Sequence, residues 1–288
     1  MIPLRDNIPA ATTPIINYLI IGLCTVVFLF QAGESDDPRE PGLIERYGMI
    51  PARITHPGEP IELLIGFTQK TTREGIPLVD QNGQPVGEPV YRQAVPSAVA
   101  PLLTLLTCIF LHGGWLHFLG NMWFLWIFGN NVEDRFGHMV YLGFYLLGGI
   151  GASLSHYVTD MNSTIPTLGA SGAIAAVMGA YMLFYPKARV LTLIPIFIFI
   201  QLLWLPAPLF LGIWFVIQLV QGVGQISLAA TTGVAWWAHI GGFAFGAAVA
   251  WFTHKIHVDR PPVERLRPGS DRTVYYQGTP YRVPRRFD

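Results

Sequence analysis

The stretch GASGAIAAVMGAYMLFY, residues 169–185, places Ser171 between glycines at the start of an apolar run. The run holds no charged residue, and Gly and Ala recur along it. Such a segment is predicted to form a membrane-spanning helix whose small residues let a neighbouring helix approach closely. Because polar side chains at membrane depth are costly, Ser171 is a candidate functional residue.

Two other apolar segments carry histidine. The segment HGGWLHFLGN, residues 112–121, has His117 and Asn121 four residues apart, on one face of a predicted helix. The segment AHIGG, residues 238–242, contains His239. A serine hydroxyl becomes an effective nucleophile when a base takes its proton, so Ser171 with His239 predicts hydrolysis of a peptide bond inside a bilayer. No carboxylate lies near either residue in its predicted helix, and a Ser/His dyad is therefore expected.

The composition is that of a membrane protein. Hydrophobic residues make up 51% of the 288 residues and charged residues 12%, against about 25% charged residues in soluble domains. The formal net charge of zero argues against a nucleic-acid partner. Cys24 and Cys108 both lie in apolar stretches and are predicted to be buried, with no metal site and no cofactor.

Apolar runs of about 20 residues predict the organisation of the chain. The six predicted spans are residues 15–31, 114–130, 139–158, 168–185, 207–222 and 234–252. The fold class is accordingly an all-α polytopic membrane protein, a six-helix bundle at residues 15–253. Tails at 1–14 and 254–288 flank the bundle, and the second tail is predicted to be largely disordered.

Two connecting segments stand out. The first loop, residues 32–113, is far longer than a connector needs and is predicted to fold onto the outer surface near the site, with a hairpin around Asn82-Gly83. The apolar run 190–206 is interrupted by Pro195 and Pro206, which predicts an interfacial connector or an extension of the fifth helix.

Basic residues predict the orientation. Residues 253–288 hold eight Lys or Arg against four Asp or Glu, whereas the 32–113 loop holds ten acidic and six basic residues. The protein is therefore expected in the inner membrane of a cell, with both termini on the cytoplasmic side. Ser171, His117 and His239 then each lie 13 or 14 residues before a cytoplasmic boundary, which puts all three roughly 20 Å above that face of the membrane core.

These motifs, in this chain order, resemble the rhomboid intramembrane serine proteases: His112, His117 and Asn121, then GASG with Ser171, then AHIGGFAFG with His239. The resemblance covers about 15–253. Two features depart from the family pattern. Ala175 stands where family members often carry a tyrosine, and no Trp-Arg pair is evident within 32–113.

The resemblance implies an intramembrane serine endopeptidase, with Ser171 as nucleophile, His239 as general base, and His117 with Asn121 at the oxyanion. From the residues themselves, Gly169 and Gly172 are expected to leave room for a substrate backbone, and the start of a helix at Ser171 offers free backbone N–H groups. His112 is expected to face a loop or the interface. Gly169 is also placed at the oxyanion site.

The implied partners are single-span membrane protein substrates within the lipid bilayer. The fifth span and the loop 223–233 are expected to act as gate and cap, with Trp214, Phe215 and Trp236 as the residues concerned. The alternative is a catalytically silent rhomboid-like protein that binds membrane clients. A solute transporter is less favoured, because the sequence has no internal repeat with matching broken helices. Taken alone, Ser171 and Asn121 would also fit polar helix-packing residues.

Overall fold

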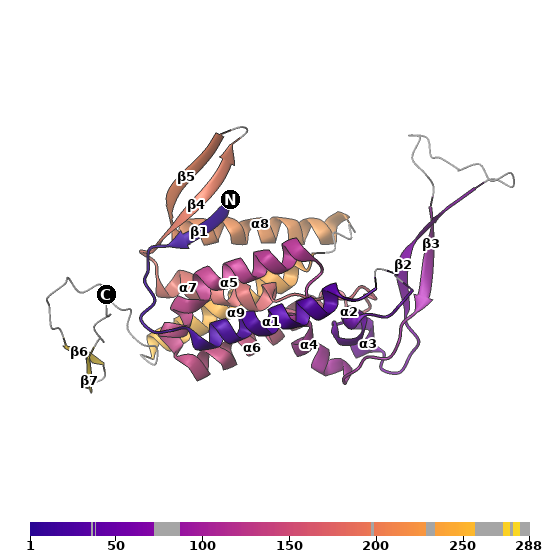
Figure 1. Ribbon diagram of the computed structural model, residues 1–288, viewed down its shortest axis with the longest axis horizontal. Coiled ribbons are helices and arrows are strands. Elements are labelled where there is room, and N and C mark those ends of the chain that lie inside the picture. The colour runs from indigo at the N-terminus through magenta and orange to yellow at the C-terminus, as the bar shows by residue number, and fades with distance from the viewer. Residues whose placement is uncertain are drawn as a thin grey trace.

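The computed structural model describes residues 1–35, 37, 39–71, 87–196, 199–228, 234–256, 273–276 and 279–282. Six long helices lie side by side and make up most of the molecule (Figure 1). They are α1 (Ile15–Ala32), α5 (Trp115–Phe136), α6 (His138–Tyr157), α7 (Ser171–Phe184), α8 (Ala207–Leu228) and α9 (Trp236–Lys255). Each corresponds to one predicted span.

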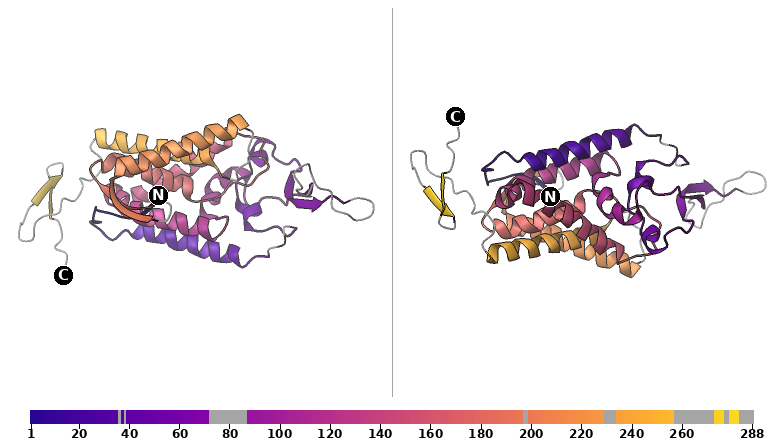
Figure 2. Two further views of the ribbon diagram at one scale, coloured as in Figure 1. Left: turned by 90° about the horizontal axis from the view of Figure 1, so that it is seen from above. Right: turned by 90° about the horizontal axis from the view of Figure 1, so that it is seen from below.

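Two of these helices are long and apolar enough to cross a membrane, namely Ile15–Ala32 and Ala207–Gln225. A third span results if Pro101–Phe110 is counted together with α5, to which it is joined at a bend of 80°. Helices α1 and α8 lie along opposite sides of the bundle (Figure 2). They expose apolar side chains outward, as a lipid-facing surface requires; examples are Leu19, Leu23, Val216 and Val220.

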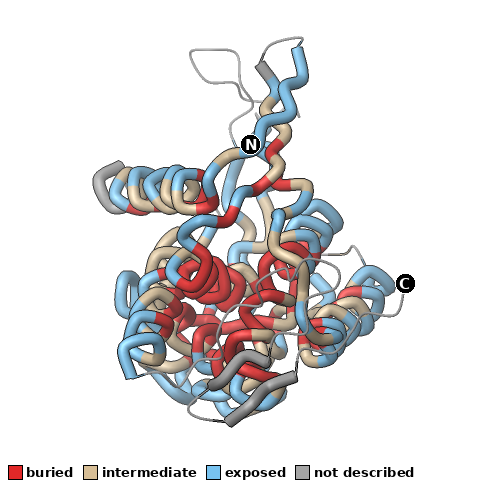
Figure 3. The backbone as a smooth tube through the Cα atoms, turned by 90° about the vertical axis from the view of Figure 1, so that its left-hand side faces the viewer, coloured by how far each residue is buried: buried red, intermediate tan, exposed pale blue. Residues whose placement is uncertain are grey.

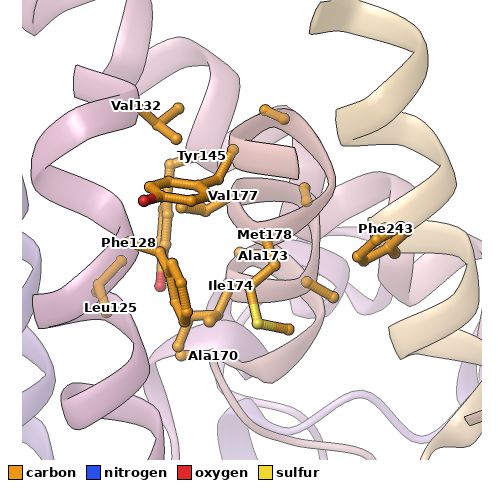
Figure 4. Close-up of a cluster of buried hydrophobic side chains, with 14 of the residues drawn as sticks. Leu125, Phe128, Val132, Tyr145, Ala170, Ala173, Ile174, Val177, Met178 and Phe243 are labelled. Carbon is orange, nitrogen blue, oxygen red and sulfur yellow. The ribbon is translucent and has the colours of Figure 1, made fainter. Parts of the chain in front are cut away.

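Helix α7 is the centre of the bundle, and eleven of its residues are buried. Buried segments gather in the middle of the molecule when it is seen along the helices (Figure 3). Around α7, side chains of α5 and α6 such as Phe128 and Tyr145 pack against Ala173 and Val177 (Figure 4). The short α7 is surrounded by protein, which explains how a serine-bearing helix is kept from lipid.

Small residues bring α7 and α9 into contact, as the sequence predicts. A Cβ at Gly242 would strike the carbonyl oxygen of Gly172, and one at Gly246 would strike that of Ala176. From the other side, a Cβ at Gly179 would strike the carbonyl oxygen of Phe243. The backbones therefore approach as closely as small-residue interfaces allow.

The three helices that carry His117, Ser171 and His239 begin at the same end of the bundle. Helix α5 begins at Trp115, α7 at Ser171 and α9 at Trp236. His117, Ser171 and His239 thus each lie in the first turn of their helix. This confirms the prediction that the three side chains share one level.

The segment between α1 and α5 folds against that same end. Its elements are α2 (Leu43–Tyr47), α3 (Pro51–Thr55), β2 (Glu62–Gln69), β3 (Gly87–Gln93), η1 (Pro101–Leu103), α4 (Thr104–Thr107) and η2 (Cys108–Phe110). Met49 and Thr167 exchange two backbone hydrogen bonds of 3.0 and 2.7 Å, and the Gly169 N–H donates to the Cys108 carbonyl at 2.9 Å. The loop is therefore bonded directly to the residues that precede Ser171.

A buried carboxylate holds this loop together. Glu45 is 6% exposed and pairs with the Arg92 guanidinium, and it accepts the Val95 N–H at 2.6 Å. The Arg53 guanidinium donates to the Glu45 carbonyl oxygen at 2.5 Å, and burial lowers the pKa of Arg53. This cluster anchors a loop in which the sequence shows no Trp-Arg pair.

The prediction of a mostly helical fold is confirmed, but the fold is not all-α, and residues 190–206 connect α7 to α8 as strands and do not extend the fifth helix. Strands β4 (Arg189–Ile196) and β5 (Phe199–Pro206) form an antiparallel hairpin, and β1 (Ile2–Asp6) pairs with β4. The run is rich in β-branched and aromatic residues, which favour strands, and Pro195 opposes a helix. Helix α8 begins immediately after the hairpin, at Ala207.

The remaining elements are two antiparallel pairs. Strands β2 and β3 form a hairpin at the end of the molecule that carries α2 to α4, but its predicted turn at Asn82-Gly83 lies outside the described residues (Figure 1). Strands β6 (Thr273–Tyr276) and β7 (Thr279–Arg282) pair within the C-terminal tail. The other residues beyond Ile256 lie outside the described part, and so does most of the predicted disordered tail.

Candidate active site

Ser171 and His239 meet at the end of the bundle where α7 and α9 begin. The Ser171 Oγ and the His239 Nε2 are 2.7 Å apart, a hydrogen-bonding distance. The small residues that bring α7 against α9 make this distance attainable. The predicted nucleophile and base are thus within reach of each other.

The other ring nitrogen of His239 has a partner that sequence reasoning missed. The His239 Nδ1 lies 2.7 Å from the Gln218 Oε1 of α8, and Gln218 is 5% exposed. The bare dyad is therefore extended to a chain of three side chains from three helices. The signal in the sequence was a glutamine inside the apolar run 207–222, 21 residues before His239.

Tryptophans flank the His239 ring. The Trp214 ring lies at 5.9 Å between centroids and is tilted by 39°, while Trp236 meets the imidazole edge-on at 6.2 Å. Ala175, which stands in place of a tyrosine, is fully buried in α7. Side-chain packing around the base thus comes from α8 and α9.

His117 lies beside the serine with a defined tautomer. The backbone N–H of Gly113 donates to the His117 Nδ1 at 3.2 Å, so the ring proton must sit on Nε2. Gly169 has a φ of +121°, and a Cβ there would lie 2.8 Å from the His117 Nε2 and 3.5 Å from the Ser171 Oγ. Glycine is required at this position, and the His117 Nε2–H is a donor on the Ser171 side.

Asn121 lies one turn further along α5. Its side-chain amide donates to the His117 carbonyl oxygen at 2.9 Å and the residue is 7% exposed. One amide N–H is thereby engaged. The predicted oxyanion role depends on the second N–H of the same amide.

Two expectations about neighbouring residues are wrong. A Cβ at Gly172 would lie 2.5 Å from the Ala152 Cβ, so this glycine serves packing between α7 and α6 and leaves no room for substrate. His112 is 1% exposed and packs edge-on against His117 at 5.5 Å, not toward a loop. It is held inward because its backbone N–H and carbonyl both bond to the Gln31 amide.

A cavity lies beside the site, on the side of the loops that precede α5, α7 and α9. This cavity of about 420 Å³ is lined by polar and apolar residues, including His117, His156, Asp160, Gln225 and Trp237. A smaller cavity of about 10 Å³ touches Ser171 and Gly169 directly, close to the least volume that holds one water. Solvent therefore has space near the serine on the loop side of the bundle.

The predicted gate residues pack on the helix that carries the base. Phe215 of α8 stacks on Phe243 of α9 at 4.6 Å between centroids, and Trp214 lies 6.0 Å from the same ring. Helix α8 continues to Leu228, further than the predicted span. Residues 229–233 of the predicted cap lie outside the described residues.

Comparison with known proteins identifies a matching family model and several similar proteins. Residues 100–256 match the family model described as Rhomboid domain. The chain is 30% identical over 172 residues to RHOMBOID-like protein 12, mitochondrial, of Arabidopsis thaliana, a match that covers 52% of this chain and 46% of that protein. It is 40% identical over 78 residues to RHOMBOID-like protein 5 of the same plant, covering 27% of this chain and 25% of that protein.

A relative from an animal is also similar. The Presenilin-associated rhomboid-like protein A, mitochondrial, of Danio rerio is 30% identical over 112 residues, covering 38% of this chain and 29% of that protein. The chain spans less than half the length of each of these three relatives. Each of these matches covers only part of both proteins. The region that matches the family model, residues 100–256, includes every residue of the Ser171 site.

Proposed function

Since the chain belongs to the rhomboid family of membrane proteins, we propose that it is an intramembrane serine endopeptidase that cleaves transmembrane segments of other membrane proteins. The observation that carries the proposal is the 2.7 Å distance between the Ser171 Oγ and the His239 Nε2 inside an apolar bundle. A protein that only binds membrane clients has no need for that contact.

In the proposed reaction, each site residue acts through a defined chemical group. The Ser171 Oγ attacks the peptide carbonyl carbon while the His239 Nε2 takes the hydroxyl proton. The oxyanion that forms is stabilised by the His117 Nε2–H, the Asn121 amide and the free N–H groups at the start of α7. His239 then gives its proton to the leaving amine, and water from the cavity beside His117 hydrolyses the acyl-enzyme.

The proposal includes a topology. All six long helices span the bilayer, with both termini in the cytoplasm of a cell with an inner membrane, so that the Ser171 end faces outward. The substrate is a single-span membrane protein that approaches sideways from the bilayer. Its helix must unwind near Ser171, because a peptide bond within a helix is shielded from attack.

Helix α8 is the proposed gate, and Phe215→Ala tests it. Removing the stacking on Phe243 is expected to loosen α8 from α9 and raise the cleavage rate of a transmembrane substrate. A short soluble peptide, which reaches Ser171 through the outer cavity, should be cut at an unchanged rate. Val216→Ala, on the exposed face of α8, is the control. Equal effects of Phe215→Ala on both substrates, with thermal stability unchanged, would rule out α8 as gate.

Labelling of the serine tests the proposed function itself. A fluorophosphonate probe is expected to label the purified protein and to lose that label in Ser171→Ala, since only an activated serine reacts. Ser155→Ala is the matched control, because the Ser155 hydroxyl donates to the Gly151 carbonyl of its own helix. Absence of labelling in the folded wild-type protein would favour the client-binding alternative.

A further inference from the structure

The position of Gln218 settles how the catalytic base is held, given the proposed function. The Gln218 Nε2 donates to the Trp214 carbonyl oxygen one turn earlier in α8, at 3.4 Å. A carbonyl oxygen only accepts, so the amide nitrogen must face it and the Oε1 must face His239. The hydrogen bond to the Trp214 carbonyl therefore decides which end of the Gln218 amide is the oxygen and which is the nitrogen.

The tautomer of His239 follows from this orientation. The Gln218 Oε1 only accepts, so the His239 Nδ1 at 2.7 Å must carry the ring proton. The neutral ring then has its lone pair on Nε2, which faces the Ser171 Oγ at 2.7 Å. This is the tautomer in which the imidazole can take the serine proton.

We infer that Gln218 is the positioning residue for His239, supplied by the gate helix. In many serine hydrolases a carboxylate takes this place and also stabilises the imidazolium. An amide fixes the orientation and tautomer without placing a negative charge at membrane depth, where charge is costly.

Gln218→Leu removes the acceptor and keeps a side chain of similar length. We expect kcat to fall by about 10- to 100-fold with KM nearly unchanged, the size of effect seen for groups that orient metal-bound histidines. The loss should be equal for a transmembrane substrate and a soluble peptide, because it acts on the base. Gln221→Leu, on the exposed side of α8, is the matched control and should retain full activity.

Gln218→Glu supplies a readout that altered packing alone would not move. It restores an acceptor at Nδ1, so it should recover most of the activity lost in the leucine variant. Its carboxylate favours the protonated imidazole, so the acidic limb of the kcat/KM profile should move to higher pH. Among described residues, the titratable groups acting electrostatically on His239 are His117 and His156, and both remain in every variant.

The outcomes separate this inference from the proposed function. If wild-type protein is not labelled at Ser171 by the fluorophosphonate, the proposed function fails. If wild-type protein is labelled and Gln218→Leu is labelled and turns over at the same rate, Gln218 has no positioning role. A loss confined to the transmembrane substrate, or an unshifted pH profile in an active Gln218→Glu, would likewise overturn the inference.

Discussion

Cleavage of a transmembrane substrate is expected to fall by at least about 10⁴-fold in Ser171→Ala, by a similar factor in His239→Ala, and no further in the double variant. Ser171 and His239 act as one unit across a 2.7 Å contact, so removal of either member leaves the other without a reaction partner. The measurement is single-turnover cleavage in detergent or liposomes with excess enzyme.

The folded state serves as the control for this cycle. Alanine fits the Ser171 position, so Ser171→Ala should keep a thermal unfolding temperature close to that of the wild type. The two variants without His239 lose a ring that packs against two tryptophans and are assayed below their own unfolding temperatures. Independent roles would instead make the double variant lose the product of the two single factors. Full activity in either single variant would remove that residue from the reaction.

Asn121→Ala is expected to lower kcat by about 10- to 1,000-fold with little change in substrate affinity. The Asn121 amide has one N–H bonded to the His117 carbonyl oxygen, and its second N–H is the proposed donor to charge that exists only in the transition state. Steady-state kinetics on a soluble peptide separate kcat from KM.

Asn130→Ala provides the comparison on the same helix, because Asn130 lies nine residues further along α5 and away from the site. It should behave as wild type. A loss in Asn121→Ala that appears wholly in KM would assign this amide to substrate positioning instead of oxyanion stabilisation.

The sequence predicted the features that depend on local pattern. Apolar runs of about 20 residues place the six helices within six residues of their observed ends, because hydrophobic length and glycine interruptions are readable along the chain. The shared level of Ser171 and His239 followed from counting residues to the end of each run. The tight α7–α9 contact followed from Gly242 and Gly246.

The features that were missed depend on contacts between distant segments. The strand β1 pairs with a segment nearly 190 residues later, and no pattern within 190–206 reveals that partner. Helix α8 contains three glutamines, Gln218, Gln221 and Gln225, and only the crossing of α8 over α9 decides which one faces His239. The sequence suggests that Gly172 leaves room for substrate, because nothing in the local pattern reveals that the Ala152 side chain of another helix fills that space.

The pairing of β1 with β4 also sets an order on biosynthesis. At about 5 to 20 residues per second, the ribosome needs roughly 10 to 40 s after making β1 to make its partner strand. During that interval α1, α5, α6 and α7 are already synthesised, and Asp6 can accept hydrogen bonds from Asn131 at 2.7 Å and Tyr181 at 2.5 Å. We therefore expect the amino-terminal strand to contact nascent helices first, and the sheet to close afterwards over the end of the bundle opposite Ser171.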